Sequence, residues 1–159
     1  MLTARLILAG TLMICVVEAS DPLWAKTANR AELREVAGAL IQSSNTFQDL
    51  AQDIKSTDNK LEHDEASDLS RVAHDTAEQV DLVWSLLELS DKMETHGDEL
   101  LMRGFTRLLA QHYIRFIELS LKEINLVPAH TERPGIAQEI GSLRNRAQRA
   151  LALLEVVAK

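Results

Sequence analysis

The densest group of side chains that could bind a metal ion or transfer a proton lies between residues 62 and 81. Its members are Glu62, His63, Asp64, Glu65, Asp68, His74, Asp75, Glu78 and Asp81. On a helix, His63 and His74 share one side but are separated by about 16 Å along the axis, too far to bind one ion together. His74 and Glu78 are a suitable pair four residues apart, but two ligands hold a divalent ion weakly. We therefore expect a solvated acidic face, with His74 and Glu78 as weak candidate metal ligands.

Other sequence signatures of catalysis or of a cofactor are missing. No Glu is followed three residues later by His, which excludes the paired motif of di-iron helical bundles. Apart from Cys15 the chain has no cysteine for covalent haem attachment. It also lacks a Gly-rich phosphate loop, Gly-x-Ser-x-Gly and His-Glu-x-x-His. We therefore expect no enzymatic activity and no cofactor.

One further histidine, His112, falls on the face that we predict to be inward in its helix. We interpret it as a neutral imidazole bonded to a neighbouring helix. Met102, near the same face, leaves a bound cofactor as the alternative interpretation.

The elements that position these residues are four amphipathic segments, in which apolar and small residues recur at alternating spacings of four and three. The predicted inward residues are Leu33, Ala37, Leu40, Ser44, Phe47, Ala51 and Ile54; Leu69, Ala73, Thr76, Val80, Val83, Leu87 and Ser90; Leu101, Phe105, Leu108, His112, Phe116 and Leu119; and Ile136, Ile140, Leu143, Ala147, Ala150, Leu154 and Val157. This pattern predicts an all-α fold, an antiparallel up-down-up-down four-helix bundle that forms a single domain over residues 20–159.

Helix boundaries follow from capping residues and from helix breakers. The first helix begins either at Asp21-Pro22 or at Asn29. We expect Gly97 to end the second helix and Asp98 to cap the third. Thr131 or Arg133, followed by Pro134, is expected to open the fourth helix.

The predicted helix over 98–127 carries more apolar residues than one inward face requires. Ile114, Ile117 and Leu121 lie outside the predicted inward face, and we expect them to contact a protein partner or a second copy of the chain. A wide contact inside an irregular bundle is the alternative. The expected function is that of an exported soluble helical-bundle binding protein without catalytic activity. The alternative is a periplasmic bundle that binds a small ligand or a metal ion, around His112 or around His74 and Glu78.

The amino-terminal residues have the layout of an export signal. Arg5 precedes an uncharged apolar run over residues 6–17, and Ala19 provides a small residue for cleavage. We therefore expect a signal peptide over residues 1–19, a mature chain that begins at Ser20, and a periplasmic or secreted location without stable membrane insertion after cleavage. Lipidation at Cys15 is an alternative, although Ile14 is bulky for lipoprotein processing.

Charge narrows the class of partner. The formal net charge is −7, which argues against general binding to nucleic acids or anionic membranes. Residues 20–96 are strongly acidic, whereas positive charge is concentrated on the last helix at Arg133, Arg144, Arg146 and Arg149. We expect these arginines to complement the acidic helices within the chain or to face an acidic partner.

Overall fold

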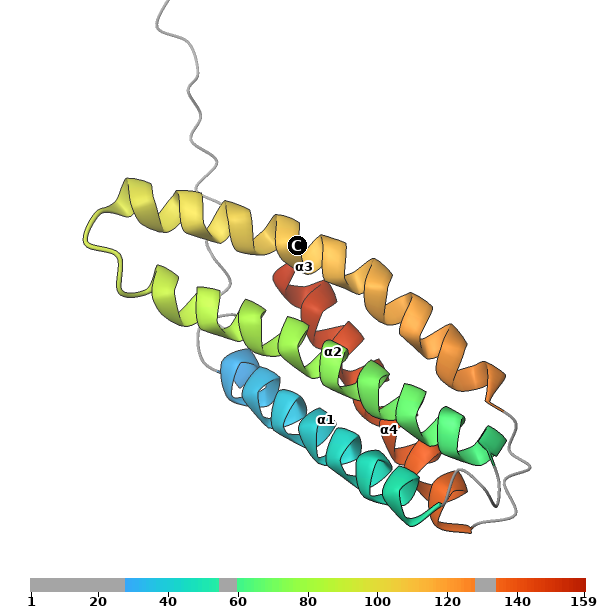
Figure 1. The fold of residues 1–159 in the computed structure, drawn as a ribbon. Helices are drawn as coiled ribbons and strands as arrows, with labels where there is room; N and C mark the ends of the chain where they lie inside the picture. Colours follow the sequence, from blue (N-terminus) through green and yellow to red (C-terminus); the bar gives the residue numbers. More distant parts are fainter. Residues whose placement is uncertain (1–27, 55–59, 128–133) are drawn as a thin grey trace, which may run out of the picture.

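The computed structural model describes residues 28–54, 60–127 and 134–159, and every regular element in these ranges is helical. The helices are α1 (Ala28–Asp53), α2 (Lys60–Ser90), α3 (His96–Leu126) and α4 (Pro134–Val157) (Figure 1). The predicted all-α fold with four helices is confirmed for this part of the chain. The expected signal peptide over residues 1–19, with Cys15, lies outside the described residues. None of the four helices combines the length and the apolarity that a bilayer crossing requires.

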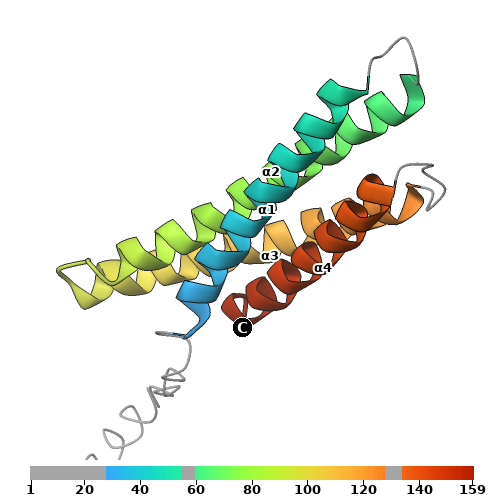
Figure 2. The same ribbon diagram turned by 90° about the horizontal axis from the view of Figure 1, so that it is seen from below.

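Each helix packs against at least two others around a shared core, and successive helices run in opposite directions (Figure 1). The contact between α1 and α2 is the most extensive, and the chain of contacts continues from α2 to α3, from α3 to α4, and from α4 back to α1. Figure 2 shows that the α1–α2 pair crosses the α3–α4 pair at an angle. α3 therefore packs against α2 on one side and α4 on the other.

The predicted inward faces of α1, α2 and α4 are confirmed. Leu40 and Phe47 of α1 and Val80 of α2 are completely buried, as are Leu143 and Leu154 of α4. The small residues in these patterns, such as Ala73 and Ala150, are buried as well. In these three helices the alternating pattern predicted the core residues correctly, because it occurs on only one face of each helix.

The predicted inward face of α3 is wrong. Leu101 is 75% exposed, Phe105 55%, Leu108 67%, Phe116 39% and Leu119 57%. His112, which we also placed inward, is exposed. The helix is rotated so that this face lies on the outside of the four helices.

The residues on the opposite face of α3 form the core instead. Ile117 has 0% exposure, and Ile114 and Leu121 are partly buried and packed against the core cluster. These are the three side chains that we predicted to contact a partner. In this structure they belong to the packing between helices.

The inward face of α3 also follows the alternating spacing, but with smaller side chains. Its positions are Thr106, Ala110, Tyr113, Ile117, Ser120 and Ile124. The Thr106 hydroxyl donates to the Met102 carbonyl at 2.8 Å, so its polar group is satisfied within the helix. Small side chains allow neighbouring helices to approach closely, and this explains how the less apolar of two candidate faces comes to be buried.

The junction between α2 and α3 differs from the prediction. α2 ends at Ser90, well before Gly97, and α3 begins at His96. Thr95 is the N-cap: its hydroxyl accepts from the Asp98 backbone N–H at 3.1 Å and donates to the Asp98 carboxylate at 2.6 Å. This reciprocal arrangement resembles a capping box, so Asp98 supports the cap from inside the first turn rather than forming it.

Of the other two helix starts, that of α4 agrees with the prediction and that of α1 differs from it. α4 begins at Pro134, as predicted. α1 begins at Ala28, which places Asn29 inside its first turn. The remaining candidate caps, Asp21-Pro22, Thr131 and Arg133, lie outside the described residues.

The reassigned orientation of α3 can be tested by two truncations. Ile117→Ala should lower the free energy of unfolding by about 2–5 kcal/mol because it leaves a cavity in the core. Leu119→Ala, on the exposed face, should change it by no more than about 0.5 kcal/mol. Urea unfolding followed by circular dichroism, at the lowest workable protein concentration, measures both. A larger loss of unfolding free energy for Leu119→Ala than for Ile117→Ala would instead support the orientation of α3 that the sequence predicted.

Candidate interaction surface

The main candidate for a functional surface is the exposed apolar face of α3. We call it the α3 stripe, formed by Leu101, Phe105, Leu108, Phe116 and Leu119. Their spacing places them on one side of the helix, with the exposed His112 between them. From Leu101 to Leu119 the stripe is about 27 Å long.

Apolar surface continues from the α3 stripe onto α2. Leu82 of α2 is 42% exposed and lines a hollow with Tyr113 and Phe116. At the other end of the stripe, Met93, just after α2, lines a hollow with Leu101, Met102 and Phe105. Leu89, 44% exposed, lies between Leu82 and Met93 on the same side of α2. The exposed surface therefore belongs to the α2–α3 hairpin rather than to one helix.

The exposed apolar area of this surface can be compared with that of typical monomeric proteins. With roughly 200 Å² for a fully exposed side chain of this kind, the α3 stripe with Leu82 and Leu89 exposes about 750 Å². The largest apolar patch of a typical monomer is about 300–600 Å² and is often functional. The surface exceeds the usual range and is a candidate for contact with another molecule.

A polar atom without a partner borders the same surface. The side-chain oxygen of Gln79 is buried and accepts no hydrogen bond within the described structure. Gln79 lines the hollow that contains Leu82 and Phe116. A buried acceptor without a donor costs about 1–3 kcal/mol, and a molecule docked at this hollow could supply the donor.

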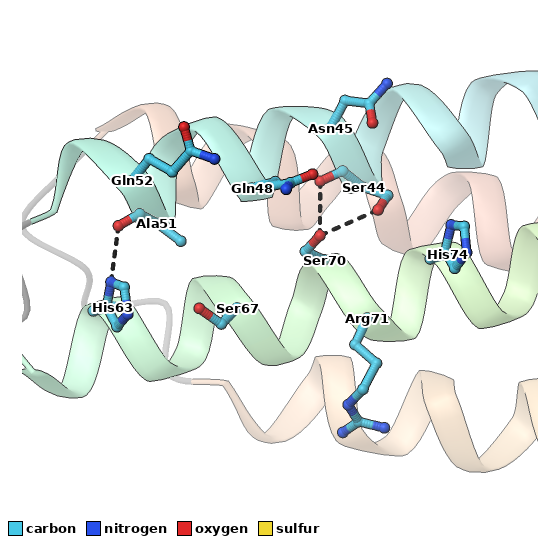
Figure 3. Close-up of a pocket in the computed structure, with 10 residues that line it drawn as sticks. All are labelled: Ser44, Asn45, Gln48, Ala51, Gln52, His63, Ser67, Ser70, Arg71 and His74. Atoms are coloured by element: carbon cyan, nitrogen blue, oxygen red, sulfur yellow. Dashed lines mark hydrogen bonds between the residues drawn. The ribbon is translucent and has the colours of Figure 1, made fainter.

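A second candidate, a polar groove of about 590 Å³, lies between α1 and α2 (Figure 3). Ser44, Ser70, His63 and His74 line it, together with Asn45, Gln48, Ala51, Gln52, Ser67 and Arg71. Figure 3 shows Arg71 pointing away from α1 and the two histidines at opposite ends of the groove.

Several polar groups of this groove are used to join the two helices. The Ser70 hydroxyl donates to the Ser44 carbonyl at 2.9 Å and lies 3.1 Å from the Ser44 hydroxyl. Nδ1 of His63 lies 2.8 Å from the Ala51 carbonyl and 3.1 Å from the Ile54 carbonyl, so it acts as the donor to the end of α1. These contacts give the groove a structural role in the packing of α1 on α2.

The predicted metal ligands do lie together. Nε2 of His74 is 3.2 Å from Oε1 of Glu78, and both side chains are more than half exposed. Among the described residues, no group of three or more His, Cys, Asp and Glu side chains could hold a metal ion. The pair therefore remains a two-ligand arrangement on a solvated face.

Ion pairs join the acidic and basic helices, as we expected from the charge distribution. Arg149 of α4 lies 3.3 Å from Glu35 and 3.9 Å from Glu32, both on α1. Arg146 pairs with Glu139 of its own helix at 3.0 Å and donates to the Ser43 hydroxyl of α1. Arg149 thus complements the acidic residues of α1 within the chain, and Arg146 is joined to α1 through Ser43.

The N-terminal end of α1 is joined to the C-terminal end of α2 by charge as well. Arg30 pairs with Asp91 and with Glu88, and the hydrogen bond that Arg30 donates to the Asp91 carboxylate raises the pKa of the Arg30 guanidinium. The Arg34 guanidinium lies 5.0 Å from the Trp84 ring centroid, a cation–π contact between the same helices. The contacts of Arg30 and Arg34 therefore hold α1 on α2 at the end opposite to His63.

Comparison of the chain with protein-family models, with curated proteins and with solved structures found no match. The interpretation of the surface therefore depends on its own geometry. The sequence pattern identified every residue of the α3 stripe but assigned them all to the core. The second alternating series, through Ala110 and Ser120, was the signal that could have corrected this assignment.

Metal binding at His74 and Glu78 can be tested by calorimetry. Because only two ligands converge there, we expect no binding heat from zinc at micromolar concentration. The His74→Ala protein should give the same trace as the unsubstituted chain. A saturable heat that disappears in His74→Ala would contradict this expectation and favour the metal-binding alternative.

The acidic start of α2 carries an electrostatic cost. Burial raises the pKa of Glu65, and the nearby charge of Glu62 raises it further. The folded chain therefore holds this proton more tightly than the unfolded chain, so stability falls as the pH rises through the range just above the ordinary pKa of Glu.

Replacing Glu65 should remove that cost. We expect Glu65→Gln to raise the free energy of unfolding at pH 7 by less than about 1 kcal/mol, with the gain disappearing near pH 4. Thermal unfolding at both pH values measures it. Asp64→Asn, at the exposed neighbouring position, controls for loss of one charge, and an equal gain from this control would assign the effect to net charge alone.

Proposed function

We propose that the chain is an exported four-helix bundle protein that acts without catalysis, by presenting the apolar face of its α2–α3 hairpin to a protein partner or to a second copy. The observation that carries this proposal is the α3 stripe: Leu101, Leu108 and their neighbours are exposed along one helix face. A helix with anchors at intervals of three and four residues is a common element of protein recognition.

The composition of the stripe supports an interaction surface. Two of the three phenylalanines in the chain, Phe105 and Phe116, lie on the stripe, whereas Phe47 is fully buried. Aromatic side chains are enriched at interfaces because they bury a large area with few rotatable bonds. Full burial of each leucine or phenylalanine side chain of the stripe would stabilise a complex by about 1.5–3 kcal/mol.

Export is the second part of the proposal and is supported by the sequence alone. Arg5, the apolar run over residues 6–17 and Ala19 are typical of a signal peptide. The proposed location is the periplasm or the extracellular space, with lipidation at Cys15 as the alternative. An interaction protein in that compartment would need no cysteine in its mature chain, and residues 20–159 contain none.

Site-specific photo-crosslinking in the native host tests the interaction surface. A benzophenone amino acid in place of Phe105 or Phe116 should give covalent adducts with a protein, because both side chains are exposed on the stripe. The same amino acid in place of Asp49, exposed on α1, is the control and should give none. Adducts at Asp49 alone, or at none of the three positions, would contradict the proposal.

Mass spectrometry of cell fractions tests export. The periplasmic or extracellular fraction should contain a chain that begins at Ser20. A lipid-modified chain that begins at Cys15 would establish the lipoprotein alternative. Full-length chain confined to the cytoplasm would refute export without bearing on the interaction surface.

A further inference from the structure

We infer that the occupant of the α3 stripe is a second copy of this chain, docked with its α3 antiparallel and with the two-fold axis of the dimer beside His112. This inference rests on the proposed function and specifies its partner. It depends on three features of the described residues: the area of the surface, the spacing of its apolar side chains about His112, and the position of His112 next to the midpoint of α3.

The exposed area matches what a stable dimer buries. About 750 Å² from each copy gives about 1,500 Å² in total, within the range of about 1,200–2,000 Å² for specific interfaces. An interface on a helix hairpin that is related by a two-fold axis uses the same patch on both copies. The surface of one chain is therefore large enough to serve as the whole interface.

The apolar residues of the stripe are arranged symmetrically about His112. Phe105 and Leu119 lie seven residues before and after it, and Leu108 and Phe116 lie four residues before and after it. In an antiparallel pair centred at His112, Phe105 of one copy therefore faces Leu119 of the other. Leu108 faces Phe116 in the same way, so four apolar contacts form along the interface. His112 of one copy faces His112 of the other.

The ends of α3 favour the antiparallel direction. α3 spans His96–Leu126, so its midpoint lies one residue from His112. An antiparallel pair centred at His112 therefore places the partly positive N-terminal end of one α3 beside the partly negative C-terminal end of the other, twice in each dimer. A parallel arrangement in register would place like ends side by side, which is less favourable.

Light scattering of the full chain, compared with two matched variants, tests the surface. We expect a dimer that Leu108→Glu weakens by on the order of 100-fold or more, because each interface contains this position twice. The control is Ile41→Glu, which changes a 36% exposed aliphatic residue on α1 and should leave the dimer intact. Circular dichroism of both variants verifies that the helices are retained.

Single cysteines test the position of the axis in a Cys15→Ser background. His112→Cys should oxidise to a covalent dimer because the two thiols meet at the axis. Leu101→Cys alone should not, because its two copies lie about 33 Å apart along the helices in the antiparallel arrangement. Leu101→Cys mixed with Glu123→Cys should form the mixed disulfide.

Each of the other outcomes overturns part of the inference. A self-disulfide of Leu101→Cys would establish the parallel arrangement. A chain that stays monomeric at 100-fold dilution and at its highest soluble concentration alike would refute the second copy as the occupant. If Phe105 and Phe116 nevertheless crosslink to another protein in cells, the proposed function stands and only the self-association fails; if they crosslink to nothing, both fail.

Discussion

A helix that packs between two neighbours can bury only one of its faces, and this constraint decides the character of the exposed surface here. α3 has two faces that satisfy the spacing of a core helix. The face through Ala110 and Ile117 packs against the other helices, and the face through Phe105 and Leu108 therefore lies outside. The apolar surface of the protein follows from which of the two faces is buried.

Steric fit explains this choice better than apolarity. Thr106, Ala110 and Ser120 are small, and small side chains permit close approach between helices at the positions where they meet. Ile117 and Ile124, both fully buried, fill the space between them. With the opposite rotation, two phenylalanines would have to fit between α2 and α4, and overpacking a core commonly costs about 1–3 kcal/mol.

Polar contacts fix the other helices more directly than α3. α1 is joined to α2 through Ser44 and Ser70 and to α4 through the Glu139 carboxylate, which accepts from the Ser43 hydroxyl at 2.6 Å. Such contacts have strict geometry and specify which faces meet. α3 is held mainly by apolar packing, with Gln111 donating to the Ala158 carbonyl at 3.3 Å. Apolar contacts are less directional, so the rotation of α3 was the hardest feature to predict from the sequence.

The sequence therefore predicted the fold more fully than it predicted the surface. Three helix faces were found because each shows a single alternating pattern, as with Leu33, Leu40 and Phe47. The start of α4 followed from Pro134, because proline fits the first position of a helix. The exposed surface was not predicted because α3 carries two alternating patterns, which differ mainly in the size of their side chains. Which of the two packs better against the neighbouring helices cannot be judged from the sequence of α3 alone.

An exposed stripe of leucine and phenylalanine must also avoid indiscriminate association. Charged residues beside it provide this selectivity, because the exposed Arg115 and Lys122, about 60–80° around the helix from the stripe, repel an approaching helix with positive charge at the facing positions. The acidic character of α2 extends the same effect to the neighbouring side of the surface. An apolar stripe supplies the area for binding, and these flanking charges restrict which surface can cover it.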